Sequence, residues 1–220
     1  GLYTAEGTRL HTTYIAARPE YGKATFFRRM EHEIRRMKQR HPTARYVGLA
    51  DGAQDNWTFL EQHTTEQIID FYHACKYIGD VGQAVIPKSK REKWTEETCH
   101  VLKHTAGAAQ TICEEMRGYL TRRLSASKRQ AVLAAVTYFD NHGHQMAYAD
   151  AVAQHVPIGS GITEAACKVI VKQRLCGSGM QWKEDGAAVV LTLRCLAYSE
   201  GRWNQFWHKI DRYGFSLASS

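Results

Sequence analysis

Long apolar runs are missing from the sequence, which contains no stretch close to the ~20 residues that a membrane-spanning helix requires. No signal peptide is visible at the amino end. The six cysteines include no Cys-x-x-Cys pair, which argues against a zinc ribbon and against a disulfide framework. Most of them lie in apolar helical patterns, so we expect buried thiols in a reducing compartment.

The composition is that of an ordinary globular protein, with 44% hydrophobic and 23% charged residues in a chain of 220. This length allows one large domain, or one domain with a sizeable insertion. The formal net charge of +7 makes a polyanionic partner plausible, although many basic proteins bind nothing acidic. Among the histidines, we interpret the tight pair His142 and His144 as part of a solvated loop rather than as metal ligands.

Apolar spacing predicts alternating strands and helices in the first part of the chain, which indicates an α/β layer. The expected strands are 9–16, 45–50 and 67–71, and the expected helices are 23–40, 56–62 and 72–82. A basic linker is predicted at 87–93, followed by a region with helices but almost no strand signal. Its helices are predicted at 94–124 and from 125 to about 139, and two later helices at 184–198 and around 203–210.

One candidate functional acid is Asp51, which comes directly after the apolar run Val47–Ala50 and before Gly52. A buried strand presents an acid in this way at its carboxyl end, where ligands of α/β sheets gather. The alternative is an Asp-Gly turn without chemistry, which is also common.

A second candidate acid is Glu164, which follows the turn Pro157-Ile-Gly-Ser-Gly161 and lies in the first turn of a predicted amphipathic helix. Glu164, Lys168 and Lys172 follow each other at intervals of four residues and therefore share one helix face. The alternative is that Glu164 only complements the helix dipole and pairs with Lys168.

Several motifs occur in an order that resembles a known family. They are Asp51-Gly-Ala, Asp70-x-x-His73, Ile-Gly-Ser-Gly-x-x-Glu164-x-x-x-Lys168, Gly-x-x-Trp182 and Leu-x-Leu-Arg194. From about residue 14 to residue 194 the chain resembles a DDE transposase of the Mutator-like group, and in particular bacterial insertion-sequence transposases of the Kra type.

The resemblance implies an α/β fold: an RNase H-like catalytic core with an all-helical insertion before the helix that carries the last acid. On that basis 1–86 would form a partial core with the second catalytic Asp, and 87–156 would form the helical insertion. The last part, 157–220, would supply carboxy-terminal helices that complete the core. Two aspartates and one glutamate hold two Mg²⁺ ions in this family, and Mn²⁺ is an expected substitute.

The resemblance also assigns the catalytic acids. Asp51 matches the second acid and Glu164 the last, and 112 residues, 52 to 163, separate them. Both are expected to be catalytic metal ligands, because hard Mg²⁺ ions prefer carboxylate oxygens. Asp70 and His73 match the group's Asp-x-x-His signature and are expected to orient the site without touching substrate. A structural hydrogen bond that caps the following helix is the alternative for these two residues.

The expected DNA contacts lie beyond the last acid. Lys168, Lys172 and Arg174 are expected beside the scissile phosphate, where they would act as cations. Trp182 is expected to stack on an unpaired base, with a position in the core as the alternative. The implied partners are transposon ends and target DNA, the implied assembly is a homo-oligomer of the full-length protein, and no membrane is involved. The implied location is the bacterial cytoplasm, in association with the nucleoid.

The chain departs from the family at the first acid. That Asp lies on a strand upstream of 9–16, and the preceding residues offer only Glu6, in a turn. We therefore expect the chain to be incomplete at its amino end and, by itself, unable to cut or join DNA. Three functions remain open: a transposase catalytic core, an inactive or domesticated DNA-binding relic, and a basic helical interaction protein whose acids are structural.

Overall fold

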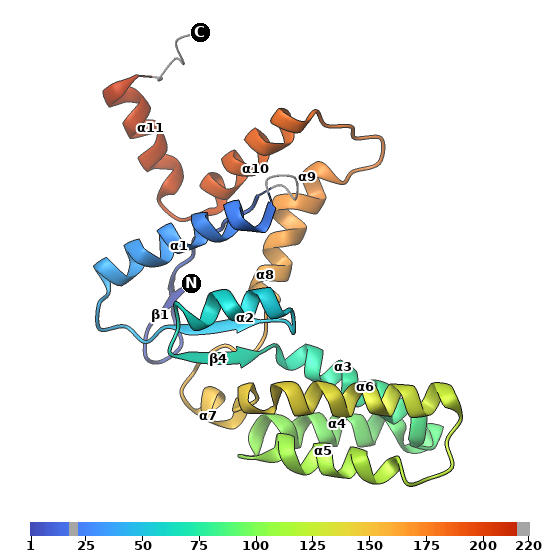
Figure 1. Cartoon of the computed structure of the whole chain (residues 1–220). Coiled ribbons are helices and arrows are strands. Elements are labelled where there is room, and N and C mark those ends of the chain that lie inside the picture. The colour runs from blue at the N-terminus through green and yellow to red at the C-terminus, as the bar shows by residue number, and fades with distance from the viewer. Residues whose placement is uncertain (18–21, 215–220) are drawn as a thin grey trace. The chain divides into compact units, whose positions relative to one another are not determined.

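A computed structural model describes residues 1–17 and 22–214 (Figure 1). It is mostly helical, at 66%, with two small sheets, so the protein is of mixed α/β composition. Its contacts divide the chain into two compact units. We call 45–160 the central unit, and 1–44 together with 161–220 the flanking unit. The division into 1–86, 87–156 and 157–220 stays a prediction.

The sheet of the central unit consists of two parallel strands, β3 (Val47–Ala50) and β4 (Glu66–Ile69). The helix α2 (Gln54–Glu61) makes the crossover that a parallel pair requires, and it buries Trp57. The prediction of strands here is confirmed with small shifts. In particular, β4 ends at Ile69 and not at residue 71, because Asp70 already caps the next helix.

Most of the central unit is helical. The helix α3 (Phe71–Val85) turns one face inward, with Ala74, Ile78 and Val81 fully buried at the spacing of one helix face. The helices are α3 (Phe71–Val85), α4 (Lys88–His104), α5 (Ala108–Tyr119), α6 (Ala126–His142), the short 3₁₀ turn η2 (Gly143–Gln145) and α7 (Tyr148–Ala153).

Two expectations for this helical region are wrong. The single helix over 94–124 is in fact α4 and α5, separated at Gly107, whose φ of 72° lies in the left-handed region that glycine adopts without strain. The basic linker over 87–93 is instead the start of α4. One of its cations has a structural role, because the Arg91 guanidinium donates to the carbonyls of Gly82 and Gln83 at 3.2 Å and so caps the end of α3.

The flanking unit is built from both ends of the chain. Its strands β1 (Leu2–Tyr3) and β2 (Arg9–His11) form an antiparallel pair. The strand expected over 9–16 is therefore too long, since β1 offers partners only as far as His11. The helices of this unit are α1 (Gly22–Arg40), α8 (Gly161–Ala166), the π-helical segment η3 (Cys167–Lys172), α9 (Gln173–Leu175), α10 (Glu184–Tyr198) and α11 (Arg202–Tyr213).

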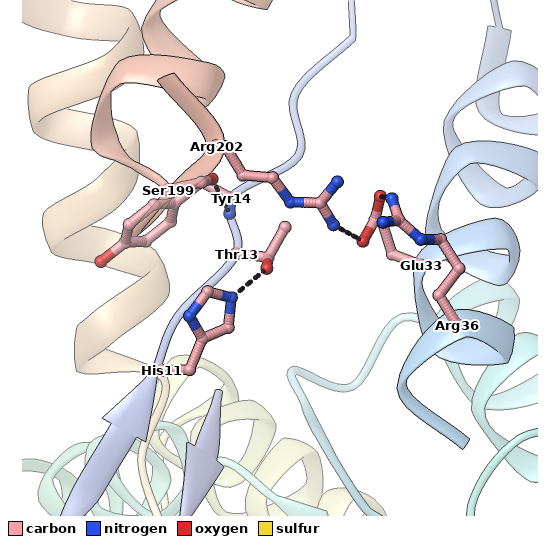
Figure 2. A network of polar contacts seen from close by, with 7 residues as sticks. All are labelled: His11, Thr13, Tyr14, Glu33, Arg36, Ser199 and Arg202. Atoms are coloured by element: carbon pink, nitrogen blue, oxygen red, sulfur yellow. Dashed lines mark hydrogen bonds and ion pairs between the residues drawn. The ribbon is translucent and has the colours of Figure 1, made fainter. Parts of the chain in front are cut away.

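Polar contacts join these distant segments of the flanking unit, as Figure 2 shows. The Tyr14 amide donates to Ser199 Oγ at 2.8 Å, which fixes the extended segment after β2 to the end of α10. Arg202, at the start of α11, pairs with Glu33 of α1. Arg36 donates to the same carboxylate at 3.4 Å. The apolar core of this unit is small and consists of Ile170, Leu191 and Cys195 with partly buried neighbours.

The large hydrophobic core belongs to the central unit, and α3 lies at its centre. No helix among the described residues is long and apolar enough to cross a membrane.

The burial of α3 leads to a prediction for stability. Ile78→Ala should lower the free energy of unfolding by about 2–5 kcal/mol, because a fully buried side chain is replaced by a cavity. Urea unfolding followed by circular dichroism measures the loss. The control is Val101→Ala on α4, which is 42% exposed and should change stability by less than about 0.5 kcal/mol. Equal effects of the two substitutions would contradict the assignment of the core.

Candidate functional site

Two acids lie at the same edge of the parallel sheet in the central unit. Asp51 directly follows β3 and Asp70 directly follows β4, and the register aligns Ala50 with Ile69. The Asp70 amide donates to the Ala50 carbonyl at 2.9 Å, which extends the ladder to the point where both acids begin. The carboxyl edge of a parallel sheet is where α/β proteins place their ligands. The two acids nevertheless have very different surroundings.

Asp51 is exposed and oriented by its own loop. Its Oδ1 accepts hydrogen bonds from the Ala53 amide at 3.3 Å and from Asn56 Nδ2 at 3.0 Å. Its Oδ2 has no hydrogen-bond partner in 1–17 or 22–214. One oxygen therefore fixes the side chain and the other faces solvent. A hard cation such as Mg²⁺ binds to carboxylates of this kind and keeps part of its water shell.

Asp70 is fully buried, and both of its oxygens are used. Oδ1 accepts from the His73 amide at 3.0 Å, which makes Asp70 the N-cap of α3. Oδ2 accepts from the Ser160 amide at 2.5 Å. Burial by itself raises the pKa of the Asp70 carboxyl, but hydrogen bonds from the Ser160 hydroxyl and amide and from the His73 and Tyr72 amides outweigh it, so that the pKa lies below its ordinary value.

The alternative for the Asp70–His73 motif, a structural hydrogen bond that caps the following helix, is therefore what the structure shows for Asp70. What the cap requires of His73 is its main-chain amide. The imidazole is 45% exposed, with Nδ1 at 3.7 Å from Asp70 Oδ1. His73 can thus reach solvent next to the sheet edge, and a role in orienting the site stays a prediction.

The segment Ile158–Ser160 is bound to the start of α3. The Phe71 amide donates to the Ile158 carbonyl at 2.9 Å, next to the bond from Ser160 to Asp70. A Cβ on Gly159 would lie 2.6 Å from the ring of Tyr72, so only glycine allows this close approach. Two motifs that are about 90 residues apart in sequence thus form one hydrogen-bonded structure, and Gly161 and the Glu164 helix follow it directly in the chain.

His142 and His144 were both expected in a solvated loop, and this expectation is wrong for His142. His142 is the last residue of α6 and lies beside the sheet edge. Its ring lies 5.0 Å from the Tyr138 ring, between centroids, and its Nδ1 is 2.9 Å from Oε1 of buried Gln145. Its Nε2 would lie 3.4 Å from a Cβ on Gly52, the neighbour of Asp51. His144 is exposed, as expected of a loop residue.

Buried polar atoms accompany His142. The Tyr138 hydroxyl and Trp57 Nε1 have no hydrogen-bond partner in the described part of the chain. Burial raises the pKa of Tyr138, and the nearby Tyr77, Asp70 and Asp51 raise it further. Tyr138 and His142 are four residues apart, but the helix was predicted to end at about 139, so this spacing would have indicated the cluster only if the helix had been extended to His142.

The expected basic residues lie on the helix after the turn, within the flanking unit. Glu164, Lys168 and Lys172 are all exposed and line one shallow hollow of about 660 Å³. Their segment includes the π-helical η3, a geometry that is frequent at functional sites. Arg194 supports this segment from α10, because its guanidinium donates to the carbonyls of Ile170 at 3.0 Å and of Val169 at 2.6 Å.

Arg174 and Trp182 lie close to each other in the same unit. The Arg174 guanidinium is 5.9 Å from the centre of the Trp182 ring, within the range of a cation–π contact. Trp182 is 37% exposed, so the alternative of a core position is wrong. An exposed indole beside an arginine is a suitable platform for a nucleic-acid base.

Charge is distributed unequally between the two units. The flanking unit has 17 lysines and arginines and 9 acids, a net charge of +8, whereas the central unit has 12 and 13, a net charge of −1. The whole positive charge of the protein thus belongs to the unit with Lys168, Lys172 and Arg174. Attraction of a polyanion is expected there and not on the central unit.

The two expected metal ligands belong to different units, Asp51 to the central and Glu164 to the flanking unit. Their convergence on shared metal ions stays a prediction. No group of three or more His, Cys, Asp or Glu side chains within the described ranges is arranged to hold a metal ion.

Comparison with models of protein families, with curated proteins and with solved structures gives no match. The resemblance to DDE transposases accordingly rests on the sequence motifs.

The surroundings of Asp70 lead to a second prediction. Asp70→Asn should lower the free energy of unfolding by about 2 kcal/mol at pH 7, because the amide keeps one acceptor oxygen and leaves a buried N–H donor without an acceptor. The folded-state pKa of Asp70 is lowered, so its contribution is present above the unfolded pKa of about 4 and is lost as the pH falls.

The difference in stability between Asp70→Asn and the wild type should therefore shrink when urea unfolding is repeated at progressively lower pH. Asp51→Asn, which alters an exposed carboxylate, is the matched control and should cost less than about 0.5 kcal/mol at pH 7. A difference that grows on acidification would contradict the role of the ionised carboxylate.

Proposed function

We propose that the chain is part of the catalytic domain of a DNA transposase, which cleaves phosphodiester bonds and joins strands with Mg²⁺. The observation that carries the proposal is the arrangement of Asp51. This acid follows a parallel strand, is oriented through one oxygen and offers the other to solvent. The chain also supplies an acid and three cations from one basic helical segment.

The elements of the central unit are compatible with an RNase H-like core that has a helical insertion. Two parallel strands with a helical crossover place an acid at the strand end, and a run of helices separates them from the segment of the last acid. The bond between Asp70 and Ser160 supports this order, because it anchors the chain four residues before Glu164 to the sheet edge. The RNase H-like fold is part of the proposal.

The chemistry explains the choice of side chains. Two bound Mg²⁺ ions would activate an oxygen nucleophile and stabilise the leaving oxyanion. Asp51 and Glu164 would hold the metal through hard carboxylate oxygens. Lys168 and Lys172 would neutralise phosphate beside Glu164, and the Arg174–Trp182 pair would receive a base.

The full-length protein is proposed to act as a homo-oligomer on transposon ends and target DNA, in the bacterial cytoplasm and associated with the nucleoid. An inactive DNA-binding relic is the second candidate. It is favoured by the complete use of both Asp70 oxygens in structural bonds, which leaves only Asp51 and Glu164 as assigned acids.

Cleavage of the polypeptide by bound iron tests the convergence of Asp51 and Glu164. Fe²⁺ in place of Mg²⁺, with ascorbate and peroxide, should cut the backbone near residue 51 and near residue 164, because radicals form beside one shared site. Asp51→Asn should remove both cuts. Glu61→Gln, an exposed acid on α2, is the control and should keep both. Cuts that respond only to a substitution in their own unit would exclude a shared site and favour the relic.

DNA binding tests the basic surface separately. Lys168→Ala, Lys172→Ala and Arg174→Ala in one variant should lower affinity for duplex DNA and flatten its dependence on salt. With fewer phosphate contacts, fewer counterions are released from the DNA on binding. For three contacts the slope of log K against log salt should fall by about 2.7. The measurement is fluorescence anisotropy across a salt series.

The matched control removes three cations of the central unit, by Lys88→Ala, Lys90→Ala and Lys93→Ala, and should leave the slope nearly unchanged. If this control has the larger effect, the DNA binds to the start of α4 and the assignment of the surface is wrong.

A further inference from the structure

The helix α4 carries a pair of histidines on its exposed side. His100 and His104 lie one helical turn apart, and both are exposed. Their ring centroids are 4.5 Å apart, with the ring planes inclined by 41°. Residues four apart share one helix face, so both imidazoles project from the same side of α4.

The other side of α4 is occupied by the core, which fixes the orientation of the pair. Thr98 and Leu102 are buried at 8% and 1% exposure and point inward. Because they anchor the helix, the turn that carries His100 and His104 is a rigid element. Neither imidazole takes part in a hydrogen bond or an ion pair within 1–17 and 22–214, so both rings keep their ligating nitrogens.

The electrostatic surroundings of the pair include groups that favour a cation. His104 is the last residue of α4, where the helix dipole presents its negative end. Glu96 lies one turn before His100 on the same face and is exposed. Lys103, which lies between the histidines in sequence and is partly buried, is a cation and acts against these groups.

We propose that His100 and His104 chelate one divalent transition-metal ion, of the class of Ni²⁺, Cu²⁺ and Zn²⁺. Imidazole nitrogen is a preferred ligand of these ions, whereas Mg²⁺ selects oxygen. Two histidines at this spacing on one helix face are a recurrent zinc-binding unit. The remaining coordination positions are taken by water, since no third His, Cys, Asp or Glu within the described ranges joins the pair.

This site is independent of the proposed transposase function. It lies on α4 of the central unit, uses nitrogen instead of oxygen ligands and requires no DNA. Mg²⁺ and transition metals are therefore expected to bind to different residues of the same protein. The pair His142 and His144 does not offer an equivalent site, because Nδ1 of His142 contacts Gln145 and the two residues are only two positions apart.

Calorimetric titration of the whole chain, prepared without an affinity tag, tests the proposal with Ni²⁺ and with Zn²⁺ at neutral pH. The wild type should bind one ion, and a large excess of Mg²⁺ should not displace it. His100→Ala and His104→Ala should each weaken binding by an order of magnitude or more, because a single imidazole remains. The matched control is His208→Ala, an exposed helical histidine without a histidine four residues away, which should leave the affinity unchanged.

A change of register provides the second test. Glu96→His combined with His104→Ala places the pair at 96 and 100, again four residues apart on the same face, and should restore binding to near the wild-type affinity. Wild-type affinity in His104→Ala would overturn the proposal, as would failure of the shifted pair to bind while circular dichroism shows an unchanged helix content.

Discussion

The buried carboxylate of Asp70 is the interaction on which the candidate site depends. One of its oxygens accepts a hydrogen bond from the His73 amide in the first turn of α3, and the other accepts one from the Ser160 amide. An ionised group with no solvent exposure is stable only because these donors replace its water. The same bonds fix the end of β4, the start of α3 and the chain that leads to Glu164. Asp51, one strand away, can therefore stay exposed and oriented without having to hold the sheet edge together.

The two aspartates at this edge have the same side chain but different roles, because Asp70 is buried and structural whereas Asp51 is exposed. Asp51 has polar partners on one oxygen only and faces water, so it retains capacity for a ligand. Lys168, Lys172 and Arg174 are far from Asp51 in sequence and belong to the other unit. The net charge is +8 on the flanking unit and −1 on the central unit. The positive field that would attract a polyanion therefore arises from the flanking unit, while the central unit contributes hydrophobic core and carboxylates.

Sequence periodicity was sufficient where the interactions are local. The apolar spacing predicted α10 over 184–198 as observed, and the run Val47–Ala50 predicted the strand before Asp51. It did not predict the bond between Asp70 and Ser160, because a contact over 90 positions leaves no periodic signal. The break at Gly107 was missed for a different reason: apolar spacing continues across it, while one left-handed residue changes the direction of the chain. The surroundings of His142 depend on Gly52 and Gln145, which no local pattern connects to it.

The flanking unit is assembled from both ends of the chain, which has a consequence for the order of folding during synthesis. The Tyr14 amide cannot bond to Ser199 until a further 185 residues have been synthesised. At a synthesis rate of about 5–20 residues per second, this takes on the order of 10–40 s. The central unit is continuous, and most of its helices contact neighbours close in sequence, so it can fold within that interval. Until the ribosome delivers α10 and α11, Glu33 also lacks Arg202. The basic helix α1 thus emerges before the central unit, and its Glu33 can pair with Arg202 only after that unit has been synthesised.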